Sequence, residues 1–172
     1  MTPAFHEYFM RLALRLAEKA AAAEETPTGC VIITAPSAAE ESMPATVKVL
    51  GRAHNQTAML KDPTAHAEMI AITQAAAAIG DFRLTDTILY VTKEPCAMCA
   101  GAIVLARIPT VVYGASDPQR GGHSIFGIMN HPALIHRAEV IGGVLGEECR
   151  NLLQGFFRAR RRAGAENGGE IM

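Results

Sequence analysis

The sequence lacks the features that would indicate a membrane, secreted or highly charged protein. No run of about 20 apolar residues is present, so we expect no membrane-spanning helix. The first residues contain neither a basic segment nor an apolar one, and no secretion signal is expected. The formal net charge is only −1, so any nucleic-acid partner would have to bind a local basic patch.

Cysteine is scarce, with four in 172 residues. Two of the four lie in one Cys-x-x-Cys motif, which does not resemble a disulfide framework. In the reducing cytoplasm, where we expect this protein, such a motif is typical of metal or redox sites. The chain shows no internal repeat and no linker, so we expect one domain over residues 1–162 and a flexible tail over 163–172.

Apolar periodicity and turn residues predict alternating helices and strands. We expect helices over residues 5–23, 66–79, 94–106 and 147–162, and strands over 28–34, 46–53, 87–92, 110–114 and 140–145. Asp62 or Thr64 is expected to cap the second helix, and Gly80 to end it. The alternation predicts an α/β protein with three α/β/α layers and a mixed five-stranded sheet.

Two short segments carry the most specific signal: His-Ala-Glu at 66–68 and Pro-Cys-Ala-Met-Cys at 95–99. One histidine and two cysteines supply three protein ligands for a zinc ion. Structural zinc sites usually have four protein ligands, whereas catalytic sites keep one position open. The pattern therefore predicts one catalytic Zn²⁺ per chain, held by His66, Cys96 and Cys99.

Glu68 gives this site a group that can move protons. Both ligand segments stand at the start of a predicted helix, where the positive end of the helix dipole stabilises thiolates. The combined pattern, His-x-Glu followed by Pro-Cys-x-x-Cys, is the known signature of zinc nucleobase deaminases. The implied reaction is hydrolytic: water attacks an amidine-like ring carbon and Glu68 carries a proton to the leaving amine.

The remaining cysteines and histidines have no such spacing. Cys30 and Cys149 fall in a predicted buried strand and in the last helix, which favours small core residues over metal ligands. The other histidines are expected at the surface or in loops; they are His6, His54, His123, His131 and His136.

The chain also resembles the bacterial tRNA-specific adenosine deaminases, members of the cytidine/deoxycytidylate deaminase superfamily that convert the wobble adenosine of an anticodon to inosine. The similarity runs from about His6 to Arg162. It is carried by residues 62–69, 82–92, 94–103, 112–117, 131–132, 136–137 and 148–161. The zinc motif is shared by all related deaminases, whereas the final Phe-Phe-Arg-x-Arg-Arg is more particular to the tRNA enzymes.

This resemblance implies a cytidine-deaminase-like fold, a homodimer with each active site near the subunit interface, and a tRNA anticodon stem-loop as partner. It implies zinc ligation and proton transfer by the residues already named. It further implies substrate contacts by Asn55, by Asp117 in the loop beside the flipped base, and by Phe157, Arg158, Arg160 and Arg161. The alternative for the last helix is that Phe156 and Phe157 pack on the core while the arginines are only solvated.

The chain departs from the family pattern around the expected base pocket. Thr28 and Cys30 replace expected apolar Val or Ile and Ala, and Lys93 replaces an expected Leu. Gln119 stands where Lys is common, although Arg120 follows. The loop over residues 35–48 is also longer than expected.

Two other functions remain open from the sequence. A deaminase of a free base or nucleoside, such as guanine, cytosine or cytidine, would use the same zinc ligands without needing the basic last helix. A non-catalytic zinc-stabilised binding protein would have no use for Glu68.

Overall fold

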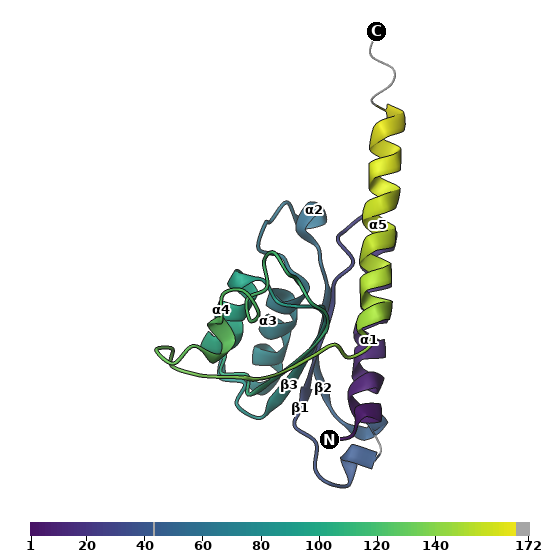
Figure 1. Ribbon diagram of the computed structural model, residues 1–172. Coiled ribbons are helices and arrows are strands. Elements are labelled where there is room, and N and C mark those ends of the chain that lie inside the picture. The colour runs from purple at the N-terminus through teal and green to yellow at the C-terminus, as the bar shows by residue number, and fades with distance from the viewer. Residues whose placement is uncertain (43, 168–172) are drawn as a thin grey trace.

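A computed structural model of the chain describes residues 1–42 and 44–167 (Figure 1). In this part of the chain the helices are α1 (Pro3–Ala22), α2 (Thr57–Leu60), α3 (Ala67–Ile79), α4 (Ala97–Leu105) and α5 (Gly146–Asn167). The strands are β1 (Gly29–Thr34), β2 (Val49–His54), β3 (Thr87–Lys93), β4 (Thr110–Ala115) and β5 (Glu139–Gly142). Among the described helices, none combines the length and the apolar character needed to cross a membrane.

The five strands form one mixed sheet in the order β2-β1-β3-β4-β5. β1 is antiparallel to both β2 and β3, whereas β3, β4 and β5 run parallel to one another. Helices α3 and α4 cover one face of the sheet, and α1 and α5 cover the other (Figure 1). The predicted three-layer α/β/α architecture is confirmed.

Strand β3 shows why the sheet needs helices on both faces. Leu89 and Val91 pack into the core under α3 and α4, while Ile88 and Tyr90 pack against α1 and α5. A strand with apolar side chains on both faces must be covered on both sides. The end of β3 at Lys93 therefore lies between two packed layers, and the segment that follows it leads directly to Cys96.

Several predicted boundaries differ from the observed ones. The short helix α2 was missed, because four residues give no readable periodicity. β2 begins at Val49 rather than at residue 46, since Pro44–Thr46 forms a 3₁₀ turn. Helix α5 continues to Asn167, beyond the predicted end near residue 162, and residues 168–172 of the expected flexible tail lie outside the described residues.

The prediction that Asp62 or Thr64 caps α3 is wrong. His66 occupies the N-cap position without a capping hydrogen bond from its side chain, and Asn55 Oδ1 accepts a hydrogen bond from the Ala67 N–H at 2.9 Å. Asp62 instead accepts hydrogen bonds from Thr64 in the preceding turn. A residue 12 positions away caps the helix, which local sequence cannot reveal.

The prediction for His6 is also wrong. This histidine is buried on α1, and its Nδ1 shares a hydrogen bond with Tyr90 Oη at 2.9 Å. His54 is the last residue of β2, whereas His123, His131 and His136 follow β4 in loops, as predicted. Cys30 and Cys149 lie in the core, as predicted.

Candidate active site

The two motif segments meet at the starts of α3 and α4. His66 is the N-cap residue of α3 and Cys96 is the N-cap residue of α4, with Cys99 in the first turn of that helix. Helix N-termini direct unpaired N–H groups and a positive partial charge outward. Both helices therefore present this field to the same three side chains.

The spacing of these side chains fits a zinc ion. His66 Nδ1 lies 3.5 Å from Cys99 Sγ and 3.7 Å from Cys96 Sγ, and all three atoms fall within 4.8 Å of one another. With zinc bonds of about 2.0–2.1 Å to nitrogen and about 2.3 Å to sulfur, a tetrahedral centre separates its ligand atoms by about 3.5–3.8 Å. The observed separations to His66 match the edges of that tetrahedron.

The side chains of Cys96 and Cys99 contact each other. The Cys99 thiol hydrogen-bonds the Cys96 sulfur, and this contact lowers the pKa of Cys96 to about 3 although burial opposes the change. The same contact, reinforced by burial, raises the pKa of Cys99. Cys96 is thus held as a thiolate, the form in which sulfur ligates a metal.

Glu68 supplies an unpaired carboxylate oxygen at this centre. The residue is only 3% exposed, and its Oε2 has no hydrogen-bond partner among the described residues. Burial raises the pKa of Glu68 above the ordinary carboxyl value. A buried carboxylate oxygen without a protein partner is costly, so it indicates a group meant to contact something that the protein itself does not provide.

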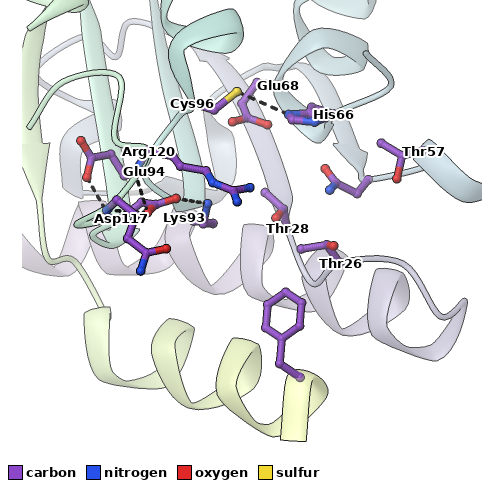
Figure 2. A pocket seen from close by; sticks show the side chains of 13 residues that line it. Thr26, Thr28, Thr57, His66, Glu68, Lys93, Glu94, Cys96, Asp117 and Arg120 are labelled. Atoms are coloured by element: carbon purple, nitrogen blue, oxygen red, sulfur yellow. Dashed lines mark hydrogen bonds and ion pairs between the residues drawn. The ribbon is translucent and has the colours of Figure 1, made fainter. Parts of the chain in front are cut away.

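A pocket of about 510 Å³ opens over these residues, within the range of about 300–1,000 Å³ that is usual for small-ligand sites. One wall is polar and uncharged, formed by Thr26, Thr28, Asn55 and Thr57. The facing wall carries the charged residues Lys93, Glu94, Asp117 and Arg120. Figure 2 shows His66, Glu68 and Cys96 between the two walls.

Asn55 lines the pocket, and its side-chain oxygen already accepts a hydrogen bond from the protein. Because its Oδ1 accepts from the Ala67 N–H, the amide orientation is fixed and Nδ2 is left without a partner among the described residues. The two N–H donors of this nitrogen therefore remain available to a bound molecule. Asn55 thus caps α3 through its oxygen and lines the pocket.

Asp117 belongs to a loop that its own carboxylate holds in place through hydrogen bonds. Its Oδ1 accepts from the backbone N–H groups of Gln119 and Arg120, and its Oδ2 accepts from Lys93 Nζ. Burial alone would raise the pKa of Asp117, but Lys93 and these N–H groups outweigh it and hold the pKa below its ordinary value. Asp117 is therefore a fixed carboxylate.

Glu94 is the anchor of this loop, and sequence reasoning assigned it no role. It is 2% exposed, and its two carboxylate oxygens accept from the Asp117 N–H, the Ser124 N–H and the Ser124 hydroxyl. These donors lie 23 to 30 residues away along the chain. In the sequence, only its position could have indicated this role: Glu94 is a charged residue that closely follows a buried strand and directly precedes the Pro-Cys motif.

The predicted residues of the last helix are divided between two faces. Phe157 is 41% exposed and lines the pocket, and Arg158 and Arg161 lie beside it on α5. Arg160 points elsewhere, with its guanidinium 5.6 Å from the centre of the Phe156 ring. Of the four predicted contact residues, Phe157 lines this pocket, Arg158 and Arg161 line a separate surface hollow that Phe157 shares, and Arg160 lies over Phe156.

Comparison with known proteins gives a consistent set of relatives. A family model described as the cytidine and deoxycytidylate deaminase zinc-binding region matches residues 3–115. The tRNA-specific adenosine deaminase of Streptococcus pyogenes is 44% identical over 155 residues, covering 90% of this chain and 91% of that protein. The enzyme of the same name from Bacillus subtilis is 40% identical over 157 residues, covering 91% of each chain.

Solved structures resemble this fold as well. A structure from a study of A-to-I editing by tRNA:A34 deaminases aligns with a TM-score of 0.73 and 37% identity, covering 85% of this chain and 99% of that one. Guanine deaminase from Bacillus subtilis aligns with a TM-score of 0.57 and 32% identity, covering 76% of this chain and 80% of that one.

Proposed function

The chain belongs to the cytidine and deoxycytidylate deaminase family, and on that premise we propose that it hydrolytically deaminates adenosine to inosine at the wobble position of a tRNA anticodon. The observation that carries the proposal is the unpaired Glu68 oxygen beside the His66, Cys96 and Cys99 ligand set, inside an open pocket. Relatives of 40–44% identity over nine-tenths of the chain, named tRNA-specific adenosine deaminases, indicate the substrate.

The donor set fits one zinc ion bound by His66, Cys96 and Cys99. Such an ion, when bound, supplies a water of lowered pKa as nucleophile. Glu68 takes a proton from the attacking water and gives a proton to the departing amino nitrogen. A new C–O bond forms at the ring carbon, the C–N bond breaks, and ammonia leaves. Burial suits Glu68 to this task, because a raised pKa brings a carboxyl group closer to the working pH.

Substrate binding is assigned to both walls of the pocket and to one face of α5. Asn55 donates its free amide N–H to the target nucleotide, and Asp117 faces the RNA beside the flipped base. Phe157 offers an aromatic face to an unstacked base, while Arg158 and Arg161 suit phosphate contact. Arg160 contributes less directly, because it stacks on Phe156.

A homodimer is part of this proposal, and α4 supports it. Every residue of α4 is apolar or glycine, yet Leu105 is 65% exposed. Ile125 and Phe126, in the loop that packs over the start of α4, are 50% and 53% exposed. Large exposed apolar side chains on a wholly apolar helix are typical of an interface, and a second copy of the chain would cover them.

We place this reaction in the cytoplasm. Ligation by Cys96 and Cys99 requires reduced thiols, which that compartment maintains. The proposed tRNA substrate is used there as well.

The test is an anticodon stem-loop with adenosine at the wobble position, assayed for inosine. The matched control carries the same sequence with the wobble adenosine exchanged with the neighbouring loop nucleotide. We expect inosine from the first RNA and almost none from the second, from free adenosine, or from cytidine and guanine. Rapid release of ammonia from guanine or cytidine, with an unmodified stem-loop, would instead identify a deaminase of free bases or nucleosides.

A further inference from the structure

We propose that Lys93 contacts the phosphate next to the target nucleotide, forming with Arg120 a phosphate subsite on the charged wall of the pocket. This inference rests on the proposed function, because it takes a polynucleotide as the substrate. It starts from a residue that departs from the family pattern, since the resemblance predicts Leu at this position.

The geometry holds the Lys93 ammonium in place. Lys93 is the last residue of β3 and lies in register with Ala115 of the neighbouring parallel strand β4. Its side chain reaches Asp117, two residues past that partner, and bonds Oδ2 there (Figure 2). A free lysine side chain loses conformational entropy when it is fixed. The ion pair has already restricted this one, so less remains to be lost on binding.

The bound ammonium still has capacity for a ligand. An ammonium carries three N–H donors, and Asp117 accepts one of them. The other two have no partner among the described residues. The Lys93 side chain is 31% exposed against 11% for Asp117, so an incoming group meets the cation before the carboxylate.

Arg120 strengthens the same wall. It lines the pocket, and its guanidinium forms no hydrogen bond or ion pair within the part of the chain that the structure describes. The two carboxylates of this wall, on Glu94 and Asp117, are occupied by backbone, hydroxyl and lysine donors. The wall therefore offers free cationic donors to the pocket and keeps its negative charges satisfied.

A phosphodiester is the anion that fits this position. Each nucleotide of an RNA loop carries one phosphate, so the base that enters the pocket brings its flanking phosphates to the wall. Lys93 lines the same pocket as the ligands His66 and Cys96, so its partner is a phosphate adjoining the target nucleotide. Arg158 and Arg161 lie outside this pocket, in a hollow that they share with Phe157, and suit phosphates elsewhere in the loop.

The experiment removes the charge from one phosphate at a time. Wild-type protein is assayed on the stem-loop and on two versions that carry an uncharged methylphosphonate on the 5′ or the 3′ side of the wobble adenosine. We expect one of these versions to lower kcat/KM about tenfold or more, because a charge-assisted hydrogen bond is lost. Equal activity on all three RNAs would overturn the inference.

Protein variants then link the effect to Lys93. On the normal RNA, Lys93→Met should lower kcat/KM about as much as the methylphosphonate does for wild type. On the sensitive methylphosphonate RNA its kcat/KM should fall little further. Lys93→Arg should still lose kcat/KM when that phosphate is replaced by the methylphosphonate. If Lys93→Met is still impaired further by the methylphosphonate to the wild-type extent, Lys93 acts only through Asp117 and the inference fails. Lys93→Gln serves as a second neutral variant, and zinc content together with circular dichroism reports folding.

Lys48→Met is the charge-matched control. Lys48 is exposed, and its carbonyl pairs with Thr34 at the far end of β1 from the pocket residue Thr28. Six strand residues, about 20 Å, separate the two ends. This variant should behave like wild type on all three RNAs. A wild-type protein that makes no inosine from any stem-loop would contradict the proposed function itself, an outcome distinct from equal activity on the three RNAs.

Discussion

At the scale of single residues, Glu68 carries the proposed proton transfer. Glu68→Gln keeps the size of the side chain and removes its ability to accept and return a proton. We expect kcat on the stem-loop to fall by about 10²–10⁴-fold, since that is the usual contribution of a general acid or base. The measurement is single-turnover inosine formation, alongside zinc content.

Zinc content should remain near one per chain in Glu68→Gln, because the three ligands are untouched. Turnover close to wild type with the metal retained would exclude Glu68 from the mechanism.

The metal ligands give a second prediction at this scale. Cys96→Ala removes the sulfur that the structure holds as a thiolate, and two protein ligands remain. We expect most of the zinc to be lost, as measured by metal analysis after dialysis. Cys149→Ala is the control, because that cysteine is buried in the core away from the ligand set. Full zinc retention in Cys96→Ala would show that other residues bind the ion.

At the scale of elements, α2 depends on a buried carboxylate. Glu25 accepts hydrogen bonds from the Thr57 hydroxyl at 3.0 Å and from the Met59 N–H at 2.8 Å. Burial alone would raise the pKa of Glu25, but these donors outweigh it and hold the pKa below its ordinary value. Glu25→Gln should lower the free energy of unfolding at pH 7 by about 1–2 kcal/mol.

The pH dependence follows from the lowered pKa. A group with a depressed folded pKa stabilises the protein above its unfolded pKa, which for Glu is about 4.3, and this stabilisation is lost as the pH falls through the folded value. The difference between wild type and Glu25→Gln should therefore be complete at pH 7 and shrink below about pH 4. Denaturant unfolding across this range measures it, and a constant difference would exclude the ionised carboxylate as its source.

Helix α5 has two faces that should respond differently to substitution. Arg158 and Arg161 line a surface hollow beside the pocket residue Phe157, whereas Arg160 stacks on Phe156. The double variant Arg158→Ala/Arg161→Ala should raise KM for the stem-loop and flatten its dependence on salt, because fewer counterions are released on binding. Arg160→Ala is the matched control on the same helix, and it should change KM and its salt dependence much less.

The salt series decides the role of these arginines. An unchanged salt slope in the double variant would mean that Arg158 and Arg161 are only a solvated face. An Arg160→Ala effect as large as that of the pair would contradict the division of faces.

At the scale of the whole molecule, the exposed apolar side chains on and beside α4 predict the oligomeric state. Wild-type protein should have a mass near twice 18.3 kDa by light scattering at micromolar concentration. Leu105→Glu places a charge in the proposed interface and should produce monomers. Leu60→Glu replaces another exposed leucine, on α2, and should leave the mass unchanged. A fully active wild-type monomer would contradict the dimer.

The sequence alone determined the zinc ligands and the class of fold. The metal motif could be read because its residues are grouped within two short segments, each at the start of one helix. Alternating helices and strands left their periodicity in the local sequence, so the three-layer mixed sheet was predictable. The short helix α2 was not predictable, because four residues are too few for a periodic pattern. The start of β2 was predicted too early, because residues 44–46 form a 3₁₀ turn.

Only the tertiary structure decided how the pocket around those ligands is built. Asn55 caps α3 from 12 residues away, Glu94 fixes a loop up to 30 residues away, and His6 pairs with Tyr90 across 84 residues. Helical phase decided that Arg158 and Arg161 lie beside the pocket residue Phe157 while Arg160 lies over Phe156. Each of these contacts joins residues brought together by the packing of separate elements, and no local pattern of residue types encodes that packing.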